Sequence, residues 1–407
     1  MFCIVCDNEK KFCRRDDIFL FYNRSKKKER FFPDLLMDNL LFLREIIVMA
    51  LLWGREYRKA DLLQRVGHIS QIAEIRPFEL SDGNERGCRG VLMTNGSGLS
   101  VTVLTDRGMS LTDVSFDGIP LAFKTPMGSV HPSFFSNKGL DWLRTWPGGF
   151  CTPCGLTYLG APCIDEGKEL GLHGRVAGIP ARQVSFGGQW IDDSVYELSV
   201  EGSVREAALF AENVVLTRRI ITRLGEPRFV IEDRFENEGY EAAPHMFLQH
   251  VNLGFPLIDD GAILLLPPCK TTPRDADAEA GIDSCRRFCV PEKDFREQVF
   301  YHQLKGDAYG MVTVGVVNRS FDKGTGLGIA FTYNRNEYPN LVEWKMMKEG
   351  AYVVGVEPAN CLVEGRGKER KRGALRFLEP GEARNYRLEI SVLRGTALAE
   401  FADSFNP

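Results

Sequence analysis

Several features that define particular classes of protein are missing from this chain of 407 residues. Its 51 Lys and Arg residues nearly balance its 55 Asp and Glu residues. The net charge of −4 therefore provides no field that would attract nucleic acid or an acidic membrane surface. A strongly apolar stretch at residues 40–53 contains Arg44 and Glu45, and it is shorter than the ~20 residues that a membrane-spanning helix needs. Neither nucleic acid nor a membrane is expected as a partner.

The 11 cysteines do not follow the spacing of a disulfide-rich protein. Their odd number and wide distribution are typical of reduced thiols in a cytoplasmic protein. The pair CTPC at 151–154 has redox-motif spacing, but no strand-to-helix unit surrounds it. A zinc site that combined this pair with Cys163 and His173 would be irregularly spaced. We expect neither a metal nor an organic cofactor.

The first 48 residues differ from the rest of the chain, because they combine scattered cysteines with the basic run RSKKKER at 24–30. We interpret residues 1–48 as an N-terminal extension that is helical or poorly ordered. Residues 49–398 are interpreted as one domain. A short helix is predicted at 59–66, ending at Gly67.

From about Gln71 onward, short runs of alternating apolar and polar residues are separated by turns. The clearest runs are 99–111, 194–209, 213–223, 228–239, 262–268, 311–317, 327–333, 351–357 and 385–393. The runs at 213–223 and 228–239 are joined by Leu-Gly-Glu-Pro, which predicts an antiparallel hairpin. Regularly spaced strands with hardly a long helix among them predict an all-β fold, a large antiparallel β-sandwich.

The stretch 245–260 contains the first candidate for chemistry. With a period of two, Met246, Leu248, His250 and Asn252 share one face of a strand, and the opposite face is also apolar. A strand that is apolar on both faces is buried between layers, so His250 is expected on a covered surface. The alternative is a neutral core histidine that is hydrogen-bonded to a carbonyl.

Glu357 is the second candidate, because it ends the run AYVVGVE and is followed by Pro358. Proline cannot donate to a strand ladder, so we expect the strand to end here and the carboxylate to lie where the strand opens into a loop. The alternative is an acidic residue that caps a strand end in water.

These segments resemble those of the aldose 1-epimerases (galactose mutarotases). VGVEPANCLVEG resembles the segment with their base glutamate, QHVNLGF the segment with their acid histidine, and GLHGRVAGIPA at 171–181 the segment with a sugar-binding histidine, here His173. TDRGMSL and LVEWKMM extend the likeness to a poorly characterised branch of the superfamily, grouped as a domain of unknown function. The resemblance covers about residues 52–395 and implies a galactose mutarotase-like supersandwich.

The resemblance also implies residues that bind the substrate. The family's early Asn-Gly-Arg segment has no clean match, and Arg107 of TDRGM is the substitute. The asparagine that precedes the acid histidine is Gln249 here. The sugar-binding carboxylate is Glu297, with Asp275 as the alternative. The remaining predicted binding residues are Arg175, Asn252 and Lys345. Arg175 and His173 are expected on one strand face, where they could instead form an inter-strand polar pair, and Lys345 could instead cover a sheet edge.

The predicted function is interconversion of sugar anomers, with His250 as the acid and Glu357 as the base. A small-molecule carbohydrate is then the partner. Two alternatives remain open: a carbohydrate-binding protein without activity, and an epimerase of a ketose or of an acidic or phosphorylated sugar. The basic loop 364–373 follows Glu357 closely enough to line the pocket rim, which would favour an acidic sugar. No feature of the sequence predicts an oligomeric state.

Overall fold

The computed structural model describes residues 49–405, and these residues belong to one compact unit. The expectation for residues 1–48 lies outside this part of the chain. Across residues 49–405, no helix combines the length and apolar character needed to cross a membrane. The eight cysteines of this part are all free thiols.

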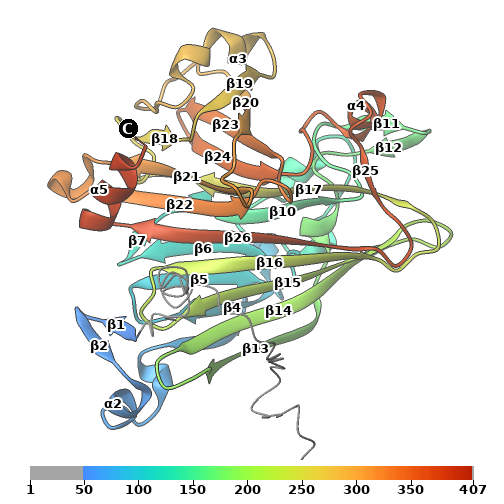
Figure 1. The fold of residues 1–407 in the computed structure, drawn as a ribbon. Coiled ribbons are helices and arrows are strands. Elements are labelled where there is room, and N and C mark those ends of the chain that lie inside the picture. The colour runs from blue at the N-terminus through green and yellow to red at the C-terminus, as the bar shows by residue number, and fades with distance from the viewer. Residues whose placement is uncertain (1–48, 406–407) are drawn as a thin grey trace, which may run out of the picture. The chain divides into compact units, whose positions relative to one another are not determined.

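The first large sheet has eight strands, all paired antiparallel, and Figure 1 shows most of them running side by side. In spatial order they are β13 (Arg182–Trp190), β14 (Tyr196–Ala207), β15 (Asn213–Arg223), β16 (Arg228–Asn237), β26 (Ala383–Leu393), β22 (Leu327–Asn334), β21 (Met311–Asn318) and β18 (Ile263–Leu265). The predicted hairpin is confirmed, because β15 pairs with β16 across the Leu-Gly-Glu-Pro turn.

The second large sheet has twelve strands and contains the candidate site. Its main order is β19 (Cys269–Pro273), β20 (Gln298–Leu304), β23 (Asn340–Lys348), β24 (Ala351–Ala359), β17 (Ala243–Leu253), β10 (Cys151–Leu156), β6 (Ser110–Phe116), β5 (Leu99–Leu104), β4 (Arg89–Thr94) and β3 (Glu74–Glu79). Two short strands pair at its side, β25 (Arg376–Leu378) with β17 and β7 (Ile119–Pro120) with β6. The run predicted at 99–111 is thus divided between two strands by a turn.

The remaining elements are short. Three strand pairs are β1 (Ala50–Leu52) with β2 (Arg55–Tyr57), β8 (Phe123–Lys124) with β9 (Gly148–Gly149), and β11 (Cys163–Asp165) with β12 (Lys168–Leu170). The α-helices of the described residues are α2 (Lys59–Leu63), α3 (Ala276–Ala280), α4 (Arg366–Lys371) and α5 (Gly395–Asp403). The 3₁₀ turns are η1 (Ile69–Gln71), η2 (Gly83–Glu85), η3 (Pro132–Phe134), η4 (Asp141–Arg144), η5 (Val176–Gly178), η6 (Ile282–Ser284) and η7 (Phe321–Gly324).

Two of these short elements lie at the start of the domain, where α2 corrects a prediction. The helix at 59–66 ends earlier, at Leu63. The last residues of the apolar stretch 40–53 form strand β1, in which Ala50–Leu52 pair with β2. Residues 40–48 of that stretch lie outside the described part.

The two large sheets face each other across one apolar core, as expected for a sandwich. Leu216 and Ile231 of the eight-stranded sheet belong to the same buried cluster as Phe247 and Val251 of β17. The prediction of a large all-β sandwich with few short helices is confirmed.

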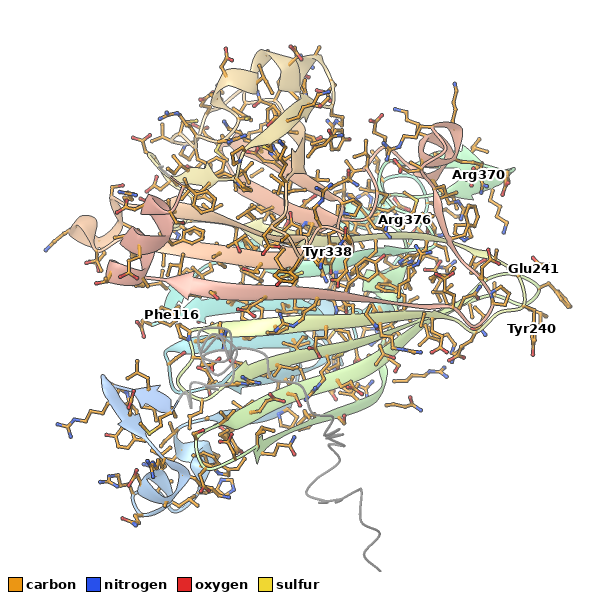
Figure 2. All side chains as sticks on the ribbon, in the orientation of Figure 1. Phe116, Tyr240, Glu241, Tyr338, Arg370 and Arg376 are labelled. Carbon is orange, nitrogen blue, oxygen red and sulfur yellow. The ribbon has the colours of Figure 1, made fainter. Side chains whose placement is uncertain are left out.

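A buried polar network crosses this core. Arg218 of β15 and Asp233 of β16 form a two-pronged ion pair, with N–O distances of 2.7 and 2.8 Å, and neither side chain is exposed. Gln249 of β17 accepts a hydrogen bond from Arg218 at 2.9 Å and donates to Asp233 at 2.6 Å. It also donates to the hydroxyl of Tyr338, which lies among the strands in Figure 2. This network ties β17 to the opposite sheet.

Strand β17 is buried on both faces, as its sequence predicts. Phe247 and Val251 point into the inter-sheet core, whereas Met246 and Leu248 belong to a second cluster that contains Trp142. His250 alternates with Gln249 and therefore points toward this second cluster.

Candidate functional site

The pairing of β17 with β24 brings the two predicted chemical groups together. Leu248 lies opposite Ala359 and Asn252 opposite Gly355, so the register places His250 opposite Glu357. The two side chains point to the same side of the sheet, and Nδ1 of His250 lies 3.1 Å from Oε1 of Glu357.

The position predicted for Glu357, at the end of its strand, is wrong. β24 does not end at Glu357 but continues through Pro358 to Ala359, with Pro358 opposite Leu341 of β23. On its other side, β24 makes no pair with β17 between Gly355 and Ala359, so the missing N–H of proline is accommodated there. Glu357 is consequently only 2% exposed and does not open into a loop.

A cavity of about 380 Å³ opens on this face of the sheet. It is lined by Leu140, Trp142, Leu143, Trp146, Ala161, Pro162, Leu172, His173, His250, Arg274, Glu297, Val299, Val342, Trp344, Glu357 and Val363. A mostly apolar wall with a few convergent polar groups is the usual character of a small-molecule site, and the volume lies in the usual range for such sites.

Three tryptophans form the aromatic wall around His250. The rings of Trp142 and Trp146 are stacked with their centroids 5.1 Å apart. The imidazole of His250 lies 5.2 Å from the ring of Trp146 and 5.6 Å from that of Trp344. Because these rings line the cavity with apolar surface, electrostatic interactions inside it are stronger than in bulk water.

Asn252 fixes the hydrogen-bonding state of His250. The Nδ2 group of Asn252 donates to the carbonyl oxygens of Gly149 and His250, which leaves its Oδ1 as the acceptor, 2.6 Å from Nδ1 of His250. This network assigns the hydrogen of neutral His250 to Nδ1. Nε2 makes no hydrogen bond to residues 49–405 and carries a free lone pair.

Burial shifts the pKa values of His250 and Glu357 in opposite directions. Burial lowers the pKa of His250 to about 4, although the hydrogen bond from Nδ1 to Asn252 partly offsets this effect. Burial also raises the pKa of Glu357 well above its ordinary value of 4.5, and the negative charge of Glu297 adds to the rise. Oε1 of Glu357 has no hydrogen-bond partner among the described residues, because its contact with His250 lacks hydrogen-bond geometry. Both groups are therefore favoured in their uncharged forms.

His173 enters the same cavity, but from a turn. Its φ of 56° is left-handed, and the turn is held by hydrogen bonds from Gly155 N–H to the His173 carbonyl and from His173 N–H to the Gly160 carbonyl. Its ring lies 5.3 Å from that of His250 and 4.9 Å from that of Trp142. Its Nδ1 is buried without a partner in the described residues, and burial, followed by the nearby His250, holds its pKa well below the usual range.

The strand face predicted for His173 and Arg175 is not present. Residues 171–175 form a turn, and Arg175 is exposed and does not line the cavity. Arg107 is also outside the cavity. It is 2% exposed, and its guanidinium donates to the carbonyl oxygens of Val130 and Thr145. It therefore supports the backbone of the loop that precedes Trp146.

Of the remaining predicted residues, only Glu297 lies at the cavity. Glu297 lines the cavity and forms an ion pair of 2.8 Å with Arg274. Asp275 instead caps helix α3. Lys345 lies on the opposite face of β23, where its ammonium group donates to the carbonyl oxygens of Ser284 and Arg287.

The basic loop 364–373 does not present its arginines to the cavity. Arg366 and Arg370 both form ion pairs with Asp165, and Arg372 pairs with Glu369. Because these arginines are paired with carboxylates away from the cavity, the loop gives no reason to expect an acidic sugar.

Sequence reasoning missed the aromatic wall and Arg274. The signal for Trp344 was available, because it precedes Lys345 on the same strand and period two places these neighbours on opposite faces. Trp142 and Trp146 belong to the irregular segment around η4, where no periodicity indicates the direction of a side chain.

The fold defined by the two large sheets is that of the galactose mutarotase-like β-sandwiches. The chain belongs to the family described as "Domain of unknown function (DUF4432)", which it matches over residues 85–392. No curated protein sequence matches it.

Solved structures agree with this fold. A candidate aldose 1-epimerase from Klebsiella pneumoniae subsp. pneumoniae MGH 78578 is 24% identical in sequence to this chain, and the two structures superpose with a TM-score of 0.77. The match covers 86% of this chain and 90% of the Klebsiella chain. A galactose mutarotase-like protein from Clostridium acetobutylicum is 12% identical with a TM-score of 0.54, covering 80% of this chain and 99% of its own. Galactose 1-epimerase from Lactobacillus acidophilus NCFM is 13% identical with a TM-score of 0.52, covering 79% and 99%.

Proposed function

We propose that the protein is an isomerase that interconverts the anomers of a neutral sugar, with His250 and Glu357 as its acid–base pair. The observation that carries the proposal is the placement of these two groups side by side, uncharged, on the floor of a tryptophan-lined cavity. His173, with its unpaired buried Nδ1, is the candidate for binding a sugar hydroxyl. The fold shared with galactose 1-epimerase supports the same class of reaction.

The arrangement differs from the one in which acid and base lie on opposite sides of a sugar ring. At 3.1 Å, no ring fits between Nδ1 of His250 and Oε1 of Glu357. The pair can still act on one sugar, because the anomeric oxygen and the ring oxygen are both bonded to the same carbon. A ring that lies over the pair presents both oxygens to one wall, where one group removes a proton and the other donates one.

The directions of the two pKa shifts indicate which of the two groups carries a proton for donation before the reaction begins. A neutral His250 offers the lone pair of Nε2 as the acceptor for the anomeric hydroxyl, and a protonated Glu357 is the donor to the ring oxygen. This reverses the roles predicted from the sequence. Ring opening leaves the roles exchanged, and closure on the other face of the carbonyl returns each proton and gives the other anomer.

Exchange spectroscopy by NMR tests the proposal directly. Samples of neutral aldoses such as glucose, galactose, mannose, xylose and arabinose are titrated with the protein, and transfer of saturation between the two anomeric protons is measured. We expect faster exchange for at least one aldose that binds. The proposal fails if sugars bind while their anomers exchange no faster than with Glu357→Gln protein, a result that favours a binding protein without activity.

The pH dependence of the catalysed rate is expected to have two limbs. As pH falls through about 4, His250 becomes protonated and loses its acceptor lone pair, so the rate decreases. As pH rises through the raised pKa of Glu357, well above 4.5, the donor proton is lost and the rate decreases again. The measurement is the exchange rate from pH 3 to 10 after subtraction of the uncatalysed rate. An acid limb centred near the ordinary pKa of histidine, ~6.5, would contradict the burial argument.

A further inference from the structure

A second cluster of reactive side chains lies on the other face of the same strands. Val342 and Trp344 of β23 line the sugar cavity, so Glu343 between them points to the opposite side. There it meets His302 of β20 and, through this histidine, residues of β19. The three strands are neighbours in the sheet, and Figure 1 shows them beneath α3.

The contacts form a continuous chain that ends at a thiol. Oε2 of Glu343 lies 2.9 Å from Nε2 of His302, and Nδ1 of His302 lies 2.9 Å from the hydroxyl of Thr271. That hydroxyl lies 3.9 Å from the Sγ atom of Cys269. Arg286 donates a hydrogen bond of 3.0 Å to the same sulfur. A thiol with a cation on one side and a relay to a histidine–carboxylate pair on the other has the surroundings of a nucleophile.

The charges around Cys269 favour the thiolate. Arg286 forms no ion pair with a carboxylate within residues 49–405, so its guanidinium is directed at the sulfur alone. Burial by itself raises the pKa of Cys269, but the neighbouring His302 and Arg286 outweigh it and the pKa is lowered. For His302 the interactions with Cys269 and Glu343 likewise outweigh burial, and its pKa is raised.

Two further titratable groups face Glu343 from the surroundings. Lys345 is held by the carbonyl oxygens of Ser284 and Arg287, and Cys285 is buried nearby, where burial and the charge of Glu343 raise its pKa. Cys285 therefore remains a thiol under conditions in which Cys269 ionises.

A separate cavity of about 390 Å³ adjoins this cluster. It is lined by Ile263, Leu264, Thr271, Ile282, Asp283, Cys285, Arg286 and Arg287. Thr271 and Arg286, which both contact Cys269, are therefore part of its wall. Two arginines against one aspartate give the wall a positive balance, which suits a small molecule with carboxylate groups.

We propose that Cys269 is a covalent modification site, whose thiolate reacts with small carboxylate-bearing disulfides that enter the cavity beside Arg286 and Arg287. The sulfur of Cys269 attacks one sulfur of the disulfide, and a new S–S bond forms as the old one breaks. Cys269 is oxidised to the mixed disulfide, and the departing sulfur leaves with the electron pair as a reduced thiolate. The proton from Cys269 passes through Thr271 to His302, and it returns through the Thr271 hydroxyl, which lines the cavity, to neutralise the departing thiolate.

Site-resolved alkylation measures the reactivity of this thiol. The full chain is treated with iodoacetamide from pH 5 to 9, and peptides are quantified by mass spectrometry. Cys163 and Cys289 are also partly exposed but lack the arginine and the relay, so they serve as internal controls. We expect Cys269 to react at least about tenfold faster than either control at pH 7. At a pH below the pKa of a thiol, lowering that pKa by one unit raises the fraction of thiolate about tenfold.

Substitutions separate the parts of the cluster. Arg286→Met and His302→Gln are each expected to slow alkylation of Cys269 toward the rate of Cys289 and to move its pH profile upward, whereas Arg286→Lys retains part of the rate. Arg287→Met leaves alkylation by the neutral reagent unchanged but lowers the yield of the mixed disulfide with glutathione disulfide. Arg286 is half-buried, so its variant remains informative if the His302 variant does not fold.

Equal alkylation rates for Cys269, Cys163 and Cys289 in the folded protein would overturn the proposal. So would an unchanged rate in Arg286→Met protein, or failure of glutathione disulfide to modify Cys269 while iodoacetamide does. None of these outcomes depends on whether the first cavity isomerises a sugar.

Discussion

Replacement of Glu357 by glutamine is expected to lower the catalysed rate of anomer exchange by about 10³-fold, the middle of the range for loss of a positioned acid or base. Glutamine keeps the size of the side chain but cannot exchange a proton with the sugar. Because the carboxyl is uncharged in the free site, the substitution changes no charge there, and sugar affinity should remain similar. Exchange NMR gives the rate, and calorimetry gives the affinity.

Glu206 provides a matched control for this substitution. It is a buried carboxyl whose pKa is also raised, to about 7, mainly by burial, but it lies outside the cavity and accepts a hydrogen bond from the hydroxyl of Thr157. Glu206→Gln should leave the rate unchanged. The double variant His250→Gln/Glu357→Gln should be little slower than Glu357→Gln alone, since residues that act as one unit are strongly non-additive. Rates that multiply independently would show that the two residues do not act as a pair.

The sequence predicts the parts of the site that depend on local periodicity. Alternation along β17 places His250 on a covered face because apolar residues occupy both sides of the strand. The same pattern correctly separates His250 from Gln249. Gln249 stands where the aldose 1-epimerases have an asparagine. Because Gln249 contacts Arg218 and Asp233 in the inter-sheet core, this difference does not change the wall of the cavity.

The features that depend on neighbouring strands were not predictable from one segment. Pro358 was expected to end its strand, but the gap in the pairing of β24 with β17 is a property of the assembled sheet. Lys345 was expected near the sugar, although which face of β23 forms the cavity depends on the segment after β19 that covers the other side. His173 adopts a left-handed turn that its sequence Leu-His-Gly does not require.

Packing between the two sheets depends on a buried charge pair whose disruption should be costly. Arg218 and Asp233 are both fully buried, and Gln249 links them to the strand that contains His250. An ion pair in such surroundings is weak evidence for stability by itself, because both charges lose their hydration on folding. Removal of one partner, however, leaves the other charge buried and unpaired.

Arg218→Met is therefore expected to lower the free energy of unfolding by about 3–5 kcal/mol. The adjacent Arg219→Met removes a partly exposed pair with Glu197 instead, where the arginine is 34% exposed, and should cost at most about 1 kcal/mol. The double variant Arg218→Met/Asp233→Leu should recover much of the loss, because it leaves no uncompensated charge, although Gln249 loses two partners. Equilibrium unfolding in urea measures all three. A cost for Arg218→Met as small as that for Arg219→Met would mean that Asp233 is neutralised or hydrated when its partner is absent, and that the pair does not hold the sheets together.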